Sequence, residues 1–169
     1  ADGDKKQIRG HAAVFDVLSE NLGGFREKIA PGAFDGVLDD DVRALFNHDE
    51  NHILGRTKSG TLRVSVDSQG LGYEIDPPDT QTARDLLISL DRGDISQSSF
   101  AFTVDEDEWR EDDEGRVVRT ITKIRQLYDV SPVTYPAYPD ADVGLRSMNA
   151  WLETRDAEKI IPVSIREKE

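Results

Sequence analysis

Residues 62–75, which read LRVSVDSQGLGYEI, decide the fold class of this chain. Two short runs at 62–66 and 71–75 are rich in valine, leucine and isoleucine, and the turn sequence Ser68-Gln69-Gly70 separates them. Runs of this kind on either side of a glycine-containing turn are typical of a β-hairpin. Two consecutive prolines follow and end the second run, because proline has no N–H to donate to a sheet. The chain is therefore expected to contain antiparallel β-structure.

The segments outside this hairpin repeat the pattern of short β-rich runs. Strands are expected at 8–15, 42–46, 98–104 and 117–130, with 131–135 as a second β-run directly after the last. Strands and helices do not alternate strictly, so the parallel sheet of an α/β protein is not expected. The sequence instead predicts an α+β protein of mainly antiparallel β-structure, with about seven short strands in a barrel or curled sheet and peripheral helices.

Two helices and one loop are expected between the strands. The stronger helix spans 80–90, where alanine and leucine residues form one apolar stripe and Thr80 or Thr82 can cap the first turn. A shorter helix is expected over 33–38, just after a proline that suits a helix start. The polar hexapeptide NHDENH at 47–52 is too rich in Asn and Asp for a helix interior and is expected to be a loop.

Composition excludes several classes of protein. The chain has 169 residues, no cysteine and a formal net charge of −13, from 21 Lys and Arg against 34 Asp and Glu. The absence of cysteine excludes a disulfide scaffold, a thiolate zinc site and a cysteine protease. The acidity argues against nucleic acid as a partner, because that affinity comes largely from Lys and Arg. No apolar run approaches the about 18 residues of a membrane-spanning helix, so a membrane partner is not expected.

The chain has three histidines, His11, His48 and His52. His11 lies in the first expected strand with no acidic or hydroxyl neighbour close in sequence, which favours a structural role. His48 and His52 are four residues apart, with Asp49 where the zinc-protease motif H-E-x-x-H has its glutamate. That motif requires a helix, which the flanking asparagines disfavour. A zinc-dependent protease through His48 and His52 is therefore an alternative, and no metal or cofactor is the main expectation.

A histidine on a loop after an apolar strand can instead act as a general base, if a hydroxyl nucleophile and an orienting acid lie near it. The candidate nucleophiles are Ser96, Ser98 and Ser99, and the candidate acids are Asp49, Asp94 and Asp129. Asp129 is unusual because it interrupts a β-rich run, where carboxylates are disfavoured. A buried acid there needs a partner, and an imidazole is a suitable one, although an exposed position at a strand edge is equally compatible with the sequence.

Five motifs that carry these residues follow one another along the chain: IAPGAF at 29–34, ALFNHD at 44–49, LGRT at 54–57, SF at 99–100 and DVSPVTYPAY at 129–138. Through them the chain, over residues 8–146, resembles the prohead (capsid maturation) proteases of tailed bacteriophages, a family similar in fold to the herpesvirus assemblin protease. The resemblance implies a serine endopeptidase on an assemblin-like β-barrel wrapped by helices.

The resemblance also implies roles for single residues. His48 looks like the general base, Ser99 like the nucleophile and Asp129 like the third, acidic member of the triad. Ser98 competes with Ser99, but adjacent residues of a strand point to opposite faces, so only one of them can face His48. Arg146, in a Gly-Leu-Arg sequence after Asp129, is a candidate donor to the oxyanion, as an arginine-bearing loop is in assemblin.

The family further implies a place and partners. Such a protease acts in the host cytoplasm, inside the assembling prohead, where it cuts the capsid protein precursor or scaffold and also itself. A homodimer is expected by analogy with the herpesvirus enzymes. Residues 1–148 are expected to form the protease domain and 149–169 a carboxyl-terminal tail, which could be the edge of a removable segment.

Two alternatives to a serine protease stay open. A catalytically silent module could keep the same fold and bind capsid protein without cutting it. The presence of both His48 and Ser99 argues for the protease, whereas the unusual Gln97-Ser98 approach to Ser99 leaves room for the silent module. The other alternative is the zinc protease.

Overall fold

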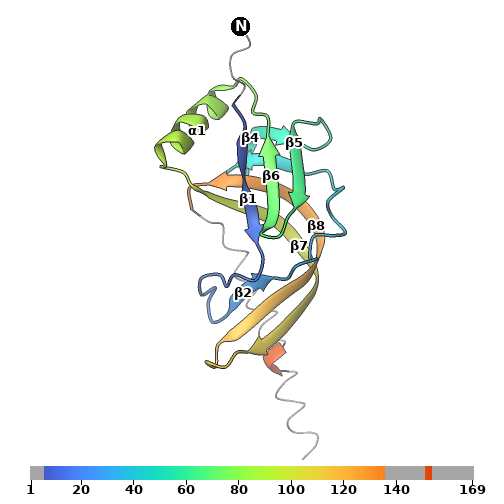
Figure 1. Cartoon of the computed structure of the whole chain (residues 1–169). Helices are drawn as coiled ribbons and strands as arrows, with labels where there is room; N and C mark the ends of the chain where they lie inside the picture. Colours follow the sequence, from blue (N-terminus) through green and yellow to red (C-terminus); the bar gives the residue numbers. More distant parts are fainter. Residues whose placement is uncertain (1–5, 136–150, 154–169) are drawn as a thin grey trace, which may run out of the picture.

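The computed structural model describes residues 6–135 and 151–153. The described part contains eight strands, the α-helix α1 (Gln81–Arg92) and a short helical segment at 151–153 (Figure 1). The strands are β1 (Ile8–Val14), β2 (Arg26–Ile29), β3 (Arg43–Phe46), β4 (Asp49–Arg56), β5 (Leu62–Val66), β6 (Gly70–Ile75), β7 (Gln97–Glu111) and β8 (Val117–Val133). The α+β class with mainly antiparallel pairing is confirmed.

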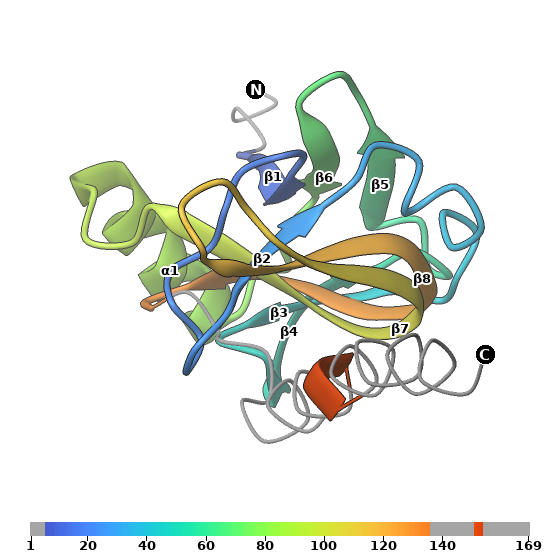
Figure 2. The ribbon, with the colours of Figure 1, turned by 90° about the horizontal axis from the view of Figure 1, so that it is seen from below.

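The strands form two sheets. One is antiparallel and has the order β1-β6-β5, and the other has the order β2-β8-β3-β4 with β7 also paired to β8. Figure 2 shows the three-stranded sheet on one side of the long β7–β8 pair, with β3 and β4 on the other. No closed barrel is present among the described residues, so the barrel that the resemblance implied is not confirmed. The described residues form eight strands, where about seven were expected.

Strand β8 organises the larger sheet. Its whole length pairs antiparallel with β7, while β2 and β3 pair parallel with it near its two ends. The buried face of β8 meets the apolar side of β1 and β6 in one core, in which Leu71, Ile75, Ile121, Leu127 and Val130 are fully buried. The β-run expected at 131–135 directly after residue 130 is part of the same strand, because β8 continues to Val133, and residues 129–133 are all buried.

The hairpin and the main helix agree with the sequence prediction. Strands β5 and β6 pair antiparallel, with the turn at 67–69 between them. Helix α1 begins after Thr80, whose hydroxyl accepts a hydrogen bond from the Ala83 N–H, and it ends at Gly93 in the left-handed conformation. Within the described residues, no helix is long and apolar enough to cross a membrane.

Two local predictions were wrong. Residues 33–38 form consecutive turns rather than a helix, because their N–H groups bond three residues back, as from Val37 to the Phe34 carbonyl. Phe34 and Val37 are nevertheless buried, as the apolar spacing indicated. Residues 47–52 are not a long loop: a two-residue turn at Asn47 and His48 leads directly into β4. The polar residues of that segment occupy the exposed half of a strand rather than a loop.

Candidate active site

His48 is positioned by the tight turn between β3 and β4. Phe46 pairs with Asp49 across this turn, and both residues between them have positive φ, 55° at Asn47 and 56° at His48. Two central residues with positive φ are the mark of a type I′ hairpin turn. Positive φ is uncommon for residues other than glycine, although asparagine and histidine are among those that adopt it most often, so the turn holds His48 in a backbone conformation that carries some strain.

Asn47 fixes this turn to the end of β8. Its N–H donates to the Pro132 carbonyl at 3.0 Å, and its side-chain oxygen accepts from the Thr134 N–H at 2.8 Å. The amide nitrogen of the same side chain donates to the Thr134 hydroxyl at 3.3 Å. Three hydrogen bonds therefore tie the residue before His48 to one strand end, and they offset the strain of the turn.

His48 contacts Asp129 directly. Its Nδ1 lies 2.6 Å from Asp129 Oδ1, and the two side chains are 23% and 10% exposed. Asp129 lies on β8, opposite Arg43 of β3, so the strand pairing that ends in the His48 turn also brings the carboxylate beneath it. A carboxylate at Nδ1 holds the proton on that nitrogen and leaves the lone pair on Nε2. The Nε2 atom is buried and has no hydrogen-bond partner among the described residues.

Ser131 also binds Asp129. Its hydroxyl donates to Asp129 Oδ1 at 2.9 Å, the same oxygen that faces His48, and Ser131 is fully buried. Sequence reasoning missed this residue because serine in a strand carries no signal of its own. The available signal was its spacing, since residues two apart on a strand share a face.

The β7–β8 register separates the two candidate serines. Ser99 pairs with Ser131, and Ala101 pairs with Asp129, so Ser99 lies on the face of the sheet that carries Asp129 and His48. Ser99 is 8% exposed. Its Oγ makes no hydrogen bond with His48 Nε2 in this structure.

Ser98 points to the opposite face. Its Oγ is hydrogen-bonded to the hydroxyl of Tyr73, at 2.6 Å, on the core side of the sheet. Phe100 and Phe102 continue this face of β7, where they stack on each other at 4.4 Å between ring centroids and pack against the core. Both rings therefore face the core, and Ser98 lies on their side of the strand.

The other candidates lie elsewhere. Ser96 is exposed and precedes β7, and Asp94 is exposed and pairs with Arg92 at 2.9 Å. Asp49 accepts hydrogen bonds from the backbone and side chain of Asn51, which lower its pKa. Of the three candidate acids, Asp129 is the one that contacts His48.

The remaining histidines bond to partners far along the chain. His52 Nδ1 lies 3.0 Å from the Thr82 hydroxyl of α1, and its ring is also 3.7 Å from Asp49. His11 lies 2.7 Å from Asp67, an acid that the fold brings from 56 residues away. His48 and His52 lie on a turn and a strand, so the helix that the zinc hypothesis requires is absent. The described residues contain no cluster of three or more His, Asp or Glu side chains suited to a metal ion.

Two predictions fall on residues that the structure does not describe. Arg146, the candidate oxyanion donor, lies outside the described residues. The same holds for most of the predicted tail, at 149–150 and 154–169. Within the tail, 151–153 are helical, and the Trp151 ring stacks on Trp109 of β7 with the ring centroids 6.3 Å apart.

Comparisons with known proteins find relatives of this chain. Residues 1–154 match the family described as caudovirus prohead serine protease. The chain is 28% identical over 171 residues to the prohead protease of Enterobacteria phage HK97, an alignment that covers 96% of this chain and 71% of that protein. No solved structure matches the chain significantly.

Proposed function

Because this chain belongs to the caudovirus prohead serine protease family, we propose that it is a serine endopeptidase with Ser99 as nucleophile, His48 as general base and Asp129 as the orienting acid. One observation carries the proposal: His48 Nδ1 is bonded to Asp129 at 2.6 Å, while its buried Nε2 has no hydrogen-bond partner in the part of the chain that the structure describes. Ser99 lies on the same face of the sheet. Acyl transfer requires a base with an available lone pair within reach of a serine hydroxyl, and the shared face is what supports Ser99 as that serine.

The proposed reaction proceeds in two steps. Ser99 Oγ attacks the scissile carbonyl carbon while its proton passes to His48 Nε2, and the imidazolium then protonates the leaving amine as the C–N bond breaks. Water next attacks the acyl carbon and gives a proton to Nε2, and the imidazolium passes that proton to Ser99 Oγ as the ester C–O bond breaks and the carboxylic acid is released. Asp129 keeps the Nδ1 proton in place and stabilises the positive imidazolium that forms in each step.

The substrate follows from the family rather than from the site. We propose that the chain cuts the capsid protein precursor or a scaffold protein, and also itself, inside the prohead in the host cell. The implied homodimer, the closed assemblin-like barrel, and the division into a protease domain at 1–148 and a tail at 149–169 are parts of the same proposal. Arg146 is the proposed oxyanion donor, and near wild-type cleavage by Arg146→Ala would remove it from the mechanism.

The test is cleavage in cells that make the full-length protease and its capsid precursor together, with the products measured by intact mass. Wild type is compared with Ser99→Ala and Ser98→Ala, a matched pair of substitutions on adjacent residues that face opposite sides of β7. Cleavage is expected to disappear in Ser99→Ala and to persist, at a reduced rate, in Ser98→Ala. Full cleavage by both variants would refute the serine mechanism.

The same experiment addresses the alternatives. A silent assembly module would leave the precursor uncut in the wild type as well. A zinc protease would lose activity when the purified wild type is treated with a chelator, whereas the Ser99 mechanism is unaffected by chelation. His48→Ala removes activity under both hypotheses, so the chelator and Ser99→Ala together distinguish them.

A further inference from the structure

We propose that Tyr73 is a positioning residue for the nucleophile, which acts by holding Ser98 and thereby aiming Ser99 at His48. This inference rests on the proposed serine mechanism. It assigns a role to Ser98, which lies next to the proposed nucleophile and has no role in the reaction steps. It also gives the three-stranded sheet a part in catalysis, although the triad lies on the other sheet.

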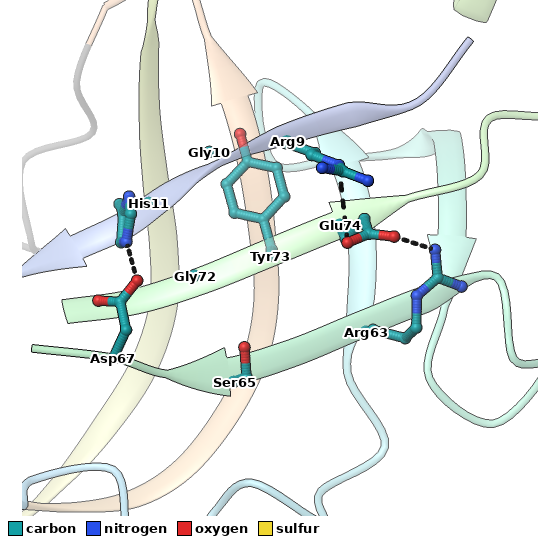
Figure 3. A pocket seen from close by; sticks show the side chains of 9 residues that line it. All are labelled: Arg9, Gly10, His11, Arg63, Ser65, Asp67, Gly72, Tyr73 and Glu74. Carbon is teal, nitrogen blue, oxygen red and sulfur yellow. Dashed lines mark hydrogen bonds and ion pairs between the residues drawn. The ribbon is translucent and has the colours of Figure 1, made fainter. Parts of the chain in front are cut away.

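The contact joins the two sheets. Tyr73 comes from β6 of the three-stranded sheet and Ser98 from β7 of the larger one. Tyr73 is 6% exposed, and its hydroxyl lies 2.6 Å from Ser98 Oγ. Figure 3 shows the ring running from β6 across β1, with its hydroxyl beyond the strand beside Gly10. A buried phenol hydroxyl needs a hydrogen-bond partner, and here Ser98 is that partner.

Gly10 makes room for this path. A Cβ at position 10 would lie 2.8 Å from the Tyr73 hydroxyl oxygen and 3.0 Å from the ring carbon that carries it. Both distances are shorter than an ordinary van der Waals contact, so a side chain here would displace the ring or its hydroxyl. Gly10 lies directly opposite Tyr73 in the β1–β6 register. Strand β1 therefore has glycine, which carries no side chain, at the position where the Tyr73 ring crosses it.

Ser98 lies near the start of β7, opposite a residue that has no backbone N–H to donate. The strand begins at Gln97, so Ser98 and Ser99 are its second and third residues, and strand ends fray first. The residue opposite Ser98 is Pro132, which has no N–H, and its carbonyl accepts from Asn47. Pro132 therefore donates no hydrogen bond to Ser98. The Tyr73 hydroxyl supplies a side-chain bond at this point.

Because adjacent residues of a strand point to opposite faces, the Tyr73–Ser98 hydrogen bond also limits the direction of the Ser99 side chain. When Ser98 is fixed toward Tyr73 on the core side, the pleat directs Ser99 to the other face, where Asp129 and Ser131 lie. A misplacement of about 1 Å of a reacting group can cost about 100-fold in rate. A looser Ser98 would allow a fraction of that displacement, so loss of the bond should cost about tenfold.

Tyr73 does not act as an acid or base in this role. Burial raises the pKa of the Tyr73 hydroxyl, with the Ser98 hydrogen bond opposing that rise, so the phenol stays neutral at the pH where a serine protease works. Loss of the hydroxyl should therefore lower the rate without moving the pH profile. A residue that transferred protons would move that profile.

The test measures how fast a fluorophosphonate modifies the full-length protease, because this reagent needs the activated serine but no capsid substrate. Ser99 Oγ forms a bond to phosphorus, fluoride leaves, and the serine proton passes to His48. Saturation kinetics separate reagent binding from the bond-forming rate, and peptide mass spectrometry identifies the modified serine. Tyr73→Phe and Ser98→Ala are each expected to lower the bond-forming rate about tenfold, with reagent binding and the pH profile unchanged.

A double variant and a rescue separate positioning from a general structural effect. If Tyr73 acts through Ser98, the Tyr73→Phe, Ser98→Ala double variant should be no slower than either single variant. Ser98→Thr keeps the hydroxyl and should restore most of the rate. Matched controls are Tyr135→Phe, on an exposed tyrosine, and Ser65→Ala, on an exposed strand serine, and both should react like the wild type.

The possible failures are distinguishable. Continued modification of Ser99→Ala would refute the serine mechanism itself. Loss of modification in Ser99→Ala together with wild-type rates in Tyr73→Phe and Ser98→Ala would overturn only the positioning role. Additive losses in the double variant, or failure of Ser98→Thr to restore the rate, would overturn it too. Gly10→Ala should behave like Tyr73→Phe, although it removes neither hydroxyl.

Discussion

The sharpest test of the proposed triad is Asp129→Asn, which removes one charge and keeps the shape of the side chain. Asp129 Oδ1 accepts from both His48 and Ser131, at 2.6 and 2.9 Å. An amide can take either of two orientations there. If its oxygen replaces Oδ1, both hydrogen bonds persist and only the charge is lost. If its NH₂ group faces His48, the ring proton moves to Nε2 and the base is blocked.

The size of the effect follows from this geometry. With the two groups in direct contact, their charge centres lie about 4 Å apart, and unit charges at that separation interact by about 4 kcal/mol at the effective dielectric of about 20 that suits protein sites. The imidazolium of the transition state loses that interaction, which corresponds to about 1,000-fold in rate at 1.36 kcal/mol per tenfold. Reversal of the tautomer costs about 10,000-fold in Ser-His-Asp proteases. Either orientation therefore predicts a loss of at least about 1,000-fold.

The assay is kcat/KM for cleavage of the capsid precursor by the full-length protease. The chain supplies its own control, because Asp67 forms a second carboxylate–histidine pair with His11 at 2.7 Å on the other sheet. Asp67→Asn is the same chemical change and should leave kcat/KM unaltered. A loss of less than tenfold in Asp129→Asn, or an equal loss in Asp67→Asn, would show that the His48–Asp129 pair is not the catalytic one.

Three further predictions concern positioning, stability and pH. Ser131→Ala should lower kcat about tenfold with KM unchanged, because one donor to Asp129 is lost, and Ser131→Thr should recover much of the rate; an unchanged kcat contradicts this. Arg119→Leu should lower the free energy of unfolding in urea by about 3 to 5 kcal/mol, because it leaves the Glu27 carboxylate buried without its 3.1 Å partner. Glu27→Gln should cost less, since Arg119 keeps its 2.8 Å pair with Asp107, and equal costs would refute the argument. The hydrogen bond from His11, followed by those from two backbone N–H groups, lowers the pKa of Asp67. The Asp67 carboxylate therefore stabilises the fold above the ordinary aspartate pKa, and this stabilisation is lost as the pH falls through the lowered pKa of the folded state. Urea titrations below about pH 4 should show that loss in the wild type and a weaker one in Asp67→Asn.

The parts of the fold that the sequence predicts are those with a local cause. The β5–β6 hairpin follows from two apolar runs around a glycine-containing turn, and α1 follows from an apolar stripe between Thr80 and Gly93. Both are determined by residues within about fifteen positions of one another, so periodicity and capping suffice to find them. The same local rules failed at 33–38, where apolar spacing of three and four occurs in buried turns rather than in a helix.

Local sequence patterns predict only part of the candidate site. His48 and Asp129 can be named from the sequence as a base and an acid, but their contact depends on the pairing of β3 with β8, across 81 residues. Ser131 lies within one of the motifs but had no role assigned to it, and Tyr73 lies in none of them. Their contacts depend on which strands pair and, for Tyr73, on the space beside Gly10. Sequence patterns report which face a residue occupies, whereas these contacts depend on which strands become neighbours.

One strand explains why these contacts occur together. Asp129 and Ser131 lie on β8, Ser99 is set by its register with β8, and the His48 turn is fixed by Asn47 to the end of β8. A slip of one residue between β7 and β8 would turn Ser99 toward the core and Ser98 toward His48. The Tyr73–Ser98 bond opposes that slip, because it holds Ser98 on the core side in the observed register. Under the proposed mechanism the two adjacent serines are therefore not interchangeable, because the Ser98 hydroxyl keeps Ser99 on the face that carries His48 and Asp129.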